Sequence, residues 1–179
     1  MDRRFFVKGA AGSAALVWLQ GLGTLRPLSW SPHVGNGYRV LSASQAATLE
    51  AMTAQIIPTD DTPGAREARV VTFIDNGLAG FAADQRPIFE QGLNALDANV
   101  RSRFPGVGGF AKLESATQIQ IMLDLDQRDP EFFESVRVAT IAGMFADPKY
   151  GGNFEKTGWK LIGFDDRFGW APPFGDYDR

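Results

Sequence analysis

The stretch DPEFFESVRVATIAGMFAD, residues 129–147, decides the fold class of this chain. Asp129 can accept a hydrogen bond from the free N–H groups of a first helical turn, and Pro130 fits the first helical position because its missing N–H is not needed there. Residues spaced three or four apart then form one face: Phe133, Val136, Thr140 and Met144. Pro148 cannot continue the helix. The stretch therefore predicts a helix with one face turned towards a core.

Four more stretches carry the same helical pattern. They are LSASQAATLEAMTAQIIP (41–58), REARVVTFIDNGLAGF (66–81), DQRPIFEQGLNALDANVRSRF (84–104) and SATQIQIMLDLDQ (115–127). Ser42 and Gln45 have the spacing of a capping box, and Asp84 and Ser115 are expected to cap the third and fourth helices. Hairpin turns between alternating apolar runs are not found. We predict an all-α fold, a small irregular helical bundle of about five helices with long ordered loops and an aromatic-rich C-terminal extension.

The composition narrows the chemistry that the chain can perform. Its 179 residues contain no cysteine and one histidine, His33, which excludes disulfides, iron–sulfur clusters, thiolate zinc sites, CxxCH haem attachment and multi-histidine metal sites. Residues 1–35 hold four Lys/Arg and one Asp, so the remaining chain has 14 basic and 20 acidic residues. Nucleic-acid binding requires a basic face. We therefore expect no nucleic-acid partner.

The N-terminal stretch MDRRFFVKGAAGSAALVWLQGLGTL, residues 1–25, has the layout of a targeting segment. Arg3, Arg4, Phe6 and Lys8 resemble the bacterial twin-arginine export signal, which carries folded proteins. The alternative is a chance Arg-Arg pair before an amphipathic helix. The following stretch is rich in Gly and Ala, too weakly apolar for a clear membrane span, and lacks an A-x-A cleavage site.

These features divide the chain into a leader with linker, residues 1–35, and a single helical domain, residues 36–179. We expect a periplasmic protein that associates with the inner membrane only indirectly or through an uncleaved leader.

Adjacent carboxylates stand in the turn-rich stretch PTDDTPGA, residues 58–65. Asp60 and Asp61 could share a proton or hold a cation, but neighbouring side chains diverge and the spacing of a calcium loop is missing. Helix capping, a turn or a contact with a partner fits them better. No GxGxxG or Walker pattern occurs. We predict no catalytic, cofactor-binding or metal-binding residue in this chain.

The C-terminal region is unusually aromatic. Residues 150–179 hold eight of the 21 aromatic residues of the chain, without helical spacing. Such a segment either folds back over its own bundle or lies in the grooves of a partner, where Trp and Tyr bind well. Glycines in DPKYGGNFEKTGWKLIGF, residues 147–164, permit close backbone approach. The predicted partner interface consists of Asp60, Asp61, Tyr150, Gly151, Gly152, Asn153, Trp159, Lys160, Phe164 and Trp170.

Three stretches resemble the gluconate 2-dehydrogenase subunit 3 family, the small subunit of FAD-dependent sugar or glycoside dehydrogenases. They are IIPTDDTPGAREARVVTFID (56–75), FFESVRVATIAGMF (132–145) and FADPKYGGNFEKTGWKLIGF (145–164). The twin-arginine leader adds to this resemblance. One departure is Gly163-Phe164-Asp165-Asp166, where the family often continues GF-P-G.

The resemblance implies a non-catalytic subunit whose partner is a large flavoprotein of the glucose–methanol–choline type. FAD would lie in that partner, and this chain would hold no cofactor. The small subunit would bind and mature the large one and supply the export signal for both, and a cytochrome c subunit often completes such complexes. Two alternatives stay open: a free-standing exported helical module that binds a small ligand, and an independent enzyme that uses Asp60 and Asp61.

Overall fold

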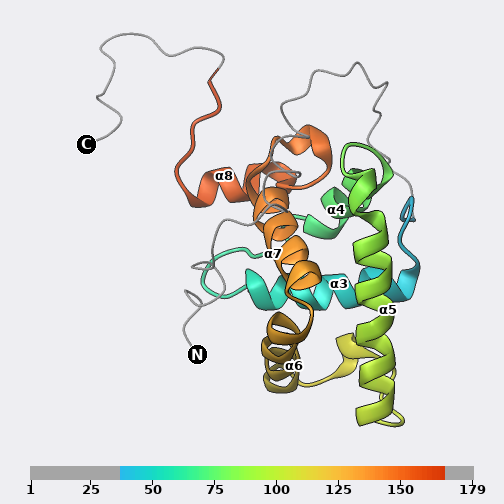
Figure 1. The fold of residues 1–179 in the computed structure, drawn as a ribbon. Coiled ribbons are helices and arrows are strands. Elements are labelled where there is room, and N and C mark those ends of the chain that lie inside the picture. The colour runs from blue at the N-terminus through green and yellow to red at the C-terminus, as the bar shows by residue number, and fades with distance from the viewer. Residues whose placement is uncertain (1–36, 168–179) are drawn as a thin grey trace.

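The computed structural model describes residues 37–167, and this part of the chain contains six α-helices and no strand (Figure 1). The helices are α3 (Ala43–Ile56), α4 (Val70–Ala79), α5 (Arg86–Arg103), α6 (Ser115–Arg128), α7 (Pro130–Phe145) and α8 (Thr157–Leu161). Short 3-10 turns lie between them: η1 (Ala83–Gln85), η2 (Phe110–Lys112), η3 (Pro148–Tyr150) and η4 (Phe154–Lys156). The all-α prediction is confirmed. The short helix α8 was not predicted, since it lies in the C-terminal stretch expected to be irregular.

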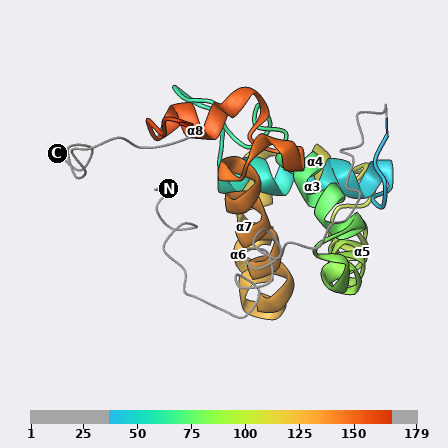
Figure 2. The ribbon, with the colours of Figure 1, turned by 90° about the horizontal axis from the view of Figure 1, so that it is seen from above.

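Helix α7 is the centre of the bundle. It packs against α3, α4, α5, α6 and α8 (Figures 1 and 2). Eleven of its 16 residues are buried, so nearly every face of the helix meets another element. Its start is as predicted, because the Asp129 carboxylate accepts the Phe132 N–H at 3.2 Å and Pro130 is the first helical residue.

Glycines bring two neighbouring helices close to α7. A Cβ at Gly92 of α5 would overlap the ring of Phe132, which also meets Phe89 edge-on with ring centroids 6.0 Å apart. A Cβ at Gly143 of α7 would lie 3.0 Å from the Phe73 ring on α4. The helix spacing in the core is therefore set by the absence of side chains at these positions.

The helix starts agree with the sequence in part. The capping box of α3 is confirmed, with Ser42 Oγ accepting the Gln45 N–H at 3.2 Å and Gln45 Oε1 accepting the Ser42 N–H at 2.9 Å. The predicted cap by Asp84 is wrong, because η1 runs straight into α5 and the Arg86 N–H bonds to the Ala83 carbonyl. Ser115 does not cap α6 either. It is the first residue of that helix.

One buried carboxylate of α4 binds the backbone of residues 39–41, which precede α3. Asp75, 3% exposed, accepts the backbone N–H groups of Arg39, Val40 and Leu41 at 2.6, 2.9 and 2.9 Å. Three hydrogen bonds to an ionised acceptor are strong enough to hold this segment in place. Between residues 37 and 167, no helix combines the length and hydrophobicity that a membrane span requires.

Candidate functional site

A buried amide side chain helps to hold the C-terminal segment, residues 146–164, against α7. Asn153 is fully buried and adopts a left-handed conformation with φ 44°. Its Nδ2 donates to the Ala146 carbonyl at 2.9 Å, and its Oδ1 accepts the Gly158 N–H at 2.8 Å. Its own N–H donates to the Gly143 carbonyl at 2.8 Å. Asn153 thus ties the end of α7 to the start of α8.

Glycines let the same segment lie directly on α4 and α7. Gly151 has φ 96°, and a Cβ there would lie 2.5 Å from Asn76 Nδ2 on α4. A Cβ at Gly152 would overlap the Gly143 carbonyl oxygen, and one at Gly158 would overlap the Met144 carbonyl oxygen. The close backbone approach expected of these glycines is therefore present, and it is made to helices of the same chain.

Two aromatic residues of the segment pack against the bundle. The half-buried Tyr150 meets Phe81 edge-on, with ring centroids 5.7 Å apart, and its carbonyl accepts Asn76 Nδ2 at 3.3 Å. The Phe154 ring lies under the guanidinium of Arg69, whose Cζ is 3.4 Å from the ring centroid. Both aromatic residues already have contacts within the bundle, so the fold-back expected as one of two possibilities occurs here.

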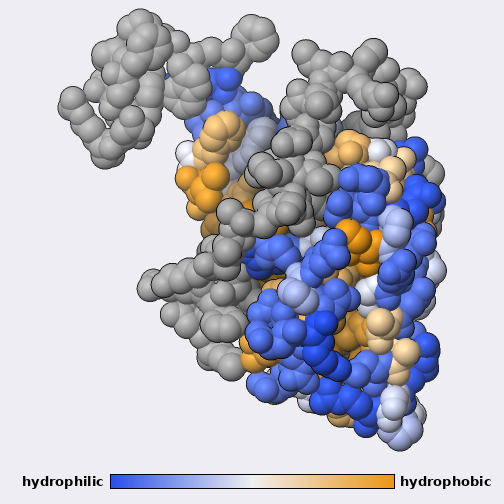
Figure 3. Space-filling model, in the orientation of Figure 1, coloured by the Kyte–Doolittle hydropathy of each residue, from blue (hydrophilic) through white to orange (hydrophobic). Residues whose placement is uncertain are grey.

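The outer side of the segment carries large apolar side chains next to charged ones. Trp159 donates its indole N–H to the Phe145 carbonyl at 2.7 Å and packs against Phe164, with ring centroids 5.0 Å apart. The next residues carry large exposed side chains: Leu161 is 41% exposed, Ile162 60% and Phe164 48%. We call Trp159, Leu161, Ile162 and Phe164 the α8 ledge. Figure 3 shows hydrophobic side chains at α8, with hydrophilic ones next to them.

The remaining predicted residues lie apart from this ledge or next to it. Lys160 is exposed beside it. Asp60 and Asp61 are exposed in the loop between α3 and α4, where Asp60 Oδ1 accepts the N–H and hydroxyl of Thr62 at 2.9 and 3.0 Å and forms a turn. Trp170 and the export-signal residues lie outside the described residues: Arg3, Arg4, Phe6 and Lys8.

The loop that carries Asp60 and Asp61 is closed by a glutamate. Glu67 Oε2 accepts the Thr59 hydroxyl at 2.7 Å and the Gly64 N–H at 2.8 Å. These hydrogen bonds, first that of Thr59 and then that of Gly64, hold the pKa of Glu67 below its ordinary value. Hydrogen bonds between its own polar groups therefore hold the loop in one conformation.

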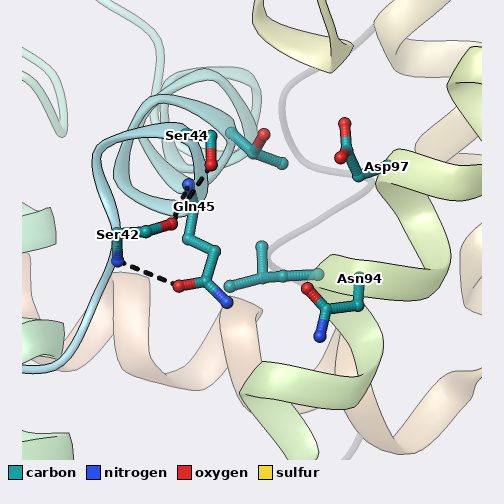
Figure 4. Close-up of a pocket in the computed structure, with 7 residues that line it drawn as sticks. Ser42, Ser44, Gln45, Asn94 and Asp97 are labelled. Carbon is teal, nitrogen blue, oxygen red and sulfur yellow. Dashed lines mark hydrogen bonds between the residues drawn. The ribbon is translucent and has the colours of Figure 1, made fainter.

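Two hollows on the described surface are small. One, of about 70 Å³, lies between the first turn of α3 and the Asn94 and Asp97 side of α5, and Figure 4 shows the Ser42–Gln45 capping bonds at its rim. The other, of about 190 Å³, is lined by Tyr38, Glu50, Arg66 and Arg69 with the start of α4. Small-molecule sites commonly have volumes of about 300–1,000 Å³, so both hollows are small. Residues 37–167 contain no group of three or more His, Cys, Asp or Glu side chains placed to hold a metal ion.

A family model described as gluconate 2-dehydrogenase subunit 3 matches residues 43–166, which include every helix described above. The chain belongs to the gluconate 2-dehydrogenase subunit 3 family. No curated protein and no solved structure matches it significantly. Because members of the gluconate 2-dehydrogenase subunit 3 family are small subunits of dehydrogenase complexes, the chain is a subunit of such a complex.

Sequence reasoning missed two parts of the candidate surface of this gluconate 2-dehydrogenase subunit 3 protein. Leu161 and Ile162 were not selected, although an apolar pair directly after Trp159-Lys160 and before a glycine was visible. Arg69 was also missed, and no local pattern could find it, because its partner Phe154 lies far away in the sequence. The predicted contact of the selected residues with another chain stays a prediction.

Proposed function

We propose that this chain is the non-catalytic small subunit that binds, stabilises and helps to mature the FAD-containing catalytic subunit of a periplasmic sugar or glycoside dehydrogenase, and that it exports this subunit through its own twin-arginine signal. The observation that carries the proposal is the α8 ledge. It places three large apolar side chains in solvent, on a backbone held by Asn153, within a family of complex subunits.

The ledge has the properties of a protein-binding surface. Exposed large apolar side chains gathered in one place are characteristic of interaction sites on soluble domains. Tryptophan and other large side chains at the centre of an interface account for much of its binding energy. The hydrogen bonds of Asn153 and the Trp159 indole fix the backbone before binding, so less conformational entropy is lost when a partner covers it.

The partner supplies the redox chemistry in this proposal. FAD lies in the large subunit, of the glucose–methanol–choline type, and no cofactor is assigned to this chain. A cytochrome c subunit that accepts the electrons is a further proposed member of the complex. The complex is periplasmic and reaches the inner membrane through its other subunits or through an uncleaved leader.

The exposed apolar α8 ledge favours this function over a free-standing module for a small ligand, and neither hollow described above has the volume usual for a small-molecule site. The turn formed by Asp60 and Thr62 likewise gives Asp60 a structural use. Replacing Asp60→Asn in the assembled complex is therefore expected to leave dehydrogenase activity unchanged. Loss of activity with the complex and its FAD intact would favour the independent-enzyme alternative.

Export and maturation test the proposal directly. The large subunit is expressed with the wild-type chain, with Arg3→Lys/Arg4→Lys, or with Arg26→Lys as a matched change outside the signal, and periplasmic FAD-loaded large subunit is measured. The twin-lysine variant is expected to leave both subunits in the cytoplasm, and Arg26→Lys is expected to have no effect. A large subunit that is exported and loaded with FAD equally well without this chain would refute the escort function.

A further inference from the structure

An unpaired guanidinium lies against Phe154, the first residue of the turn η4 that precedes α8. Arg69 packs on the Phe154 ring with its Cζ 3.4 Å from the centroid, and within the described residues this guanidinium forms no hydrogen bond or ion pair. A guanidinium packed over an aromatic ring keeps N–H donors at its edge available for an anion. Arg69 is thus a positioned cation without an anionic partner in the part of the chain that the structure describes.

Two arginines and one carboxylate line the hollow next to Arg69. The carboxylate in the lining is that of Glu50, and its pair with Arg66 is long, with Nη1 and Oε1 3.9 Å apart. This distance exceeds that of a hydrogen bond, so Glu50 does not occupy the donors of Arg66. Outside the lining, Glu67 interacts electrostatically with Arg66, and Asp75 with Tyr38. Residues 36–179 as a whole carry 14 basic and 20 acidic residues, so a lining with more arginines than carboxylates is a local exception.

A neutral donor completes the lining. Burial, followed by the negative charges of Glu50 and Asp75, raises the pKa of Tyr38 above its ordinary value. The Tyr38 hydroxyl therefore keeps its proton at neutral pH and can donate it to an anion. Thr72 of α4 lines the same hollow.

From this geometry we infer that Arg69, Arg66 and Tyr38 form a carboxylate-binding site next to Phe154. A carboxylate matches the site because it is planar and accepts two parallel hydrogen bonds from one guanidinium. Arg69 offers such a fork, while Arg66 and Tyr38 provide a second charge and a neutral donor.

The site takes the side-chain carboxylate of an Asp or Glu on the catalytic subunit, a step that rests on the proposed function. Phe154, on which Arg69 packs, begins η4, and η4 continues directly into α8. The same stretch of backbone therefore carries both Phe154 and the ledge, and α8 lies next to the end of α7 (Figures 1 and 2). A subunit that extends from the ledge over Phe154 removes water from around Arg69, and an unpaired charge in a protein interface is unfavourable. The volume of about 190 Å³ suits a side-chain carboxylate better than a whole free sugar acid, which is the other possible source.

Binding of the full chain to the catalytic subunit tests the site. The dissociation constant is measured over a range of NaCl concentrations for wild type, Arg69→Gln, Arg69→Lys and Arg101→Gln. The last is a matched charge loss on the exposed end of α5. Arg69→Gln is expected to weaken binding by about tenfold or more and to lower its salt dependence, and Arg69→Lys is expected to lie between. Arg101→Gln is expected to change the affinity less than about twofold.

A second titration distinguishes the source of the carboxylate. The full chain without its partner is titrated with gluconate, and with glucose as the uncharged control, by NMR. No preference for gluconate together with the Arg69→Gln defect in complex formation assigns the site to a protein carboxylate. Gluconate binding that Arg69→Gln abolishes assigns it to a free sugar acid.

Two results separate this inference from the proposed function. The carboxylate site is overturned if Arg69→Gln binds the catalytic subunit as tightly as Arg101→Gln does and the wild-type chain does not bind gluconate. The proposed function stands in that case. A wild-type chain that forms no complex refutes the proposed function, and the gluconate titration alone then decides the site.

Discussion

The bundle around α7 and the C-terminal segment are stabilised in opposite ways. In the bundle, apolar side chains such as Phe89, Phe132 and Val136 are buried on both sides of each helix contact. In the C-terminal segment, the contacts with the bundle are made by glycines and by the hydrogen bonds of Asn153 and Trp159, while Ile162 stays in solvent. The apolar side chains of the bundle are buried within it, whereas those at the end of the segment are exposed and can contact another chain.

This difference indicates which residues can form a binding surface without a role in the stability of the fold. Burial in the bundle is spread over many residues, so each position contributes to folding. The segment depends on a few polar atoms, which leaves exposed side chains such as Ile162 with little part in folding. The predictions below change one side of this comparison at a time and run from the largest to the smallest expected effect on the free energy of unfolding.

The largest loss is expected in the bundle. Phe132→Ala removes a ring that is 1% exposed and packs on Gly92 and Phe89. It is expected to lower the free energy of unfolding by about 3–5 kcal/mol. Urea unfolding followed by circular dichroism measures the loss. Phe164→Ala, the same change on the ledge, is the matched control and is expected to cost less than about 1 kcal/mol. Equal losses for the two variants would contradict the comparison.

A smaller loss of unfolding free energy is expected at Asn153, where the bundle and the C-terminal segment meet. Asn153→Gly keeps a residue suited to φ 44° but removes the side-chain bonds to Ala146 and Gly158. We expect a loss of about 1–3 kcal/mol, because a buried carbonyl and N–H lose their partners. Hydrogen exchange should quicken at the Gly158 amide and stay slow at Val136 in the bundle.

The variant Asn153→Ala separates the side-chain effect from the backbone effect. Alanine lacks the same hydrogen bonds and also tolerates a left-handed conformation poorly, so it is expected to cost about 1–2 kcal/mol more than glycine. If alanine and glycine are equally destabilising, the left-handed backbone at this position is not a constraint.

The sequence predicted the bundle well because its signals are local. The Ser42 capping box, the Asp129 cap with Pro130 and the helical spacing of Leu49, Met52 and Ile56 all lie within a few residues of one another, and the structure has each of them. The misplaced cap at Asp84 has a local cause too. A 3-10 turn can precede a helix and use its backbone carbonyls where a side-chain cap was expected.

The C-terminal segment was less predictable because its contacts are distant in sequence and its backbone is unusual. Asn153, Glu155 and Lys156 have positive φ, which non-glycine residues rarely adopt and which no composition reveals. The glycines were expected to allow close approach, but not to which helices. Exposure of Ile162 could not be predicted, since an apolar residue in a sequence is ordinarily expected to be buried.

Acid is expected to weaken the loop that supports the segment by a few tenths of a kcal/mol, because Glu67 is exposed and solvent screens its interactions. The pKa of Glu67 is lowered in the folded chain, chiefly by the Thr59 hydroxyl and then by the Gly64 N–H. Its contribution is therefore present above the unfolded value of about 4.3 and is lost as the pH falls through the lower folded value.

Glu67→Gln measures this contribution. Between about pH 4.3 and the lower folded pKa, the variant is expected to lose less stability on acidification than wild type does. Glu90→Gln, on the exposed side of α5, should keep the wild-type pH dependence. Unfolding free energies at pH 7 and pH 3.5 provide the comparison. A Glu67→Gln chain that loses stability on acidification as much as wild type would show that the Thr59 and Gly64 hydrogen bonds do not favour the ionised form.

The smallest effect on stability and a large effect on binding are expected at the ledge. Ile162 is 60% exposed and packs on little, so Ile162→Ala should change the free energy of unfolding by less than about 0.5 kcal/mol. If the ledge binds the catalytic subunit, the same change should weaken the complex by about tenfold, because large apolar side chains at the centre of an interface dominate its affinity. Ile119→Ala on α6, at the other end of the bundle from α8, is the matched change and should leave the affinity unaltered. A stable Ile162→Ala chain that binds as tightly as wild type would remove the ledge from the interface.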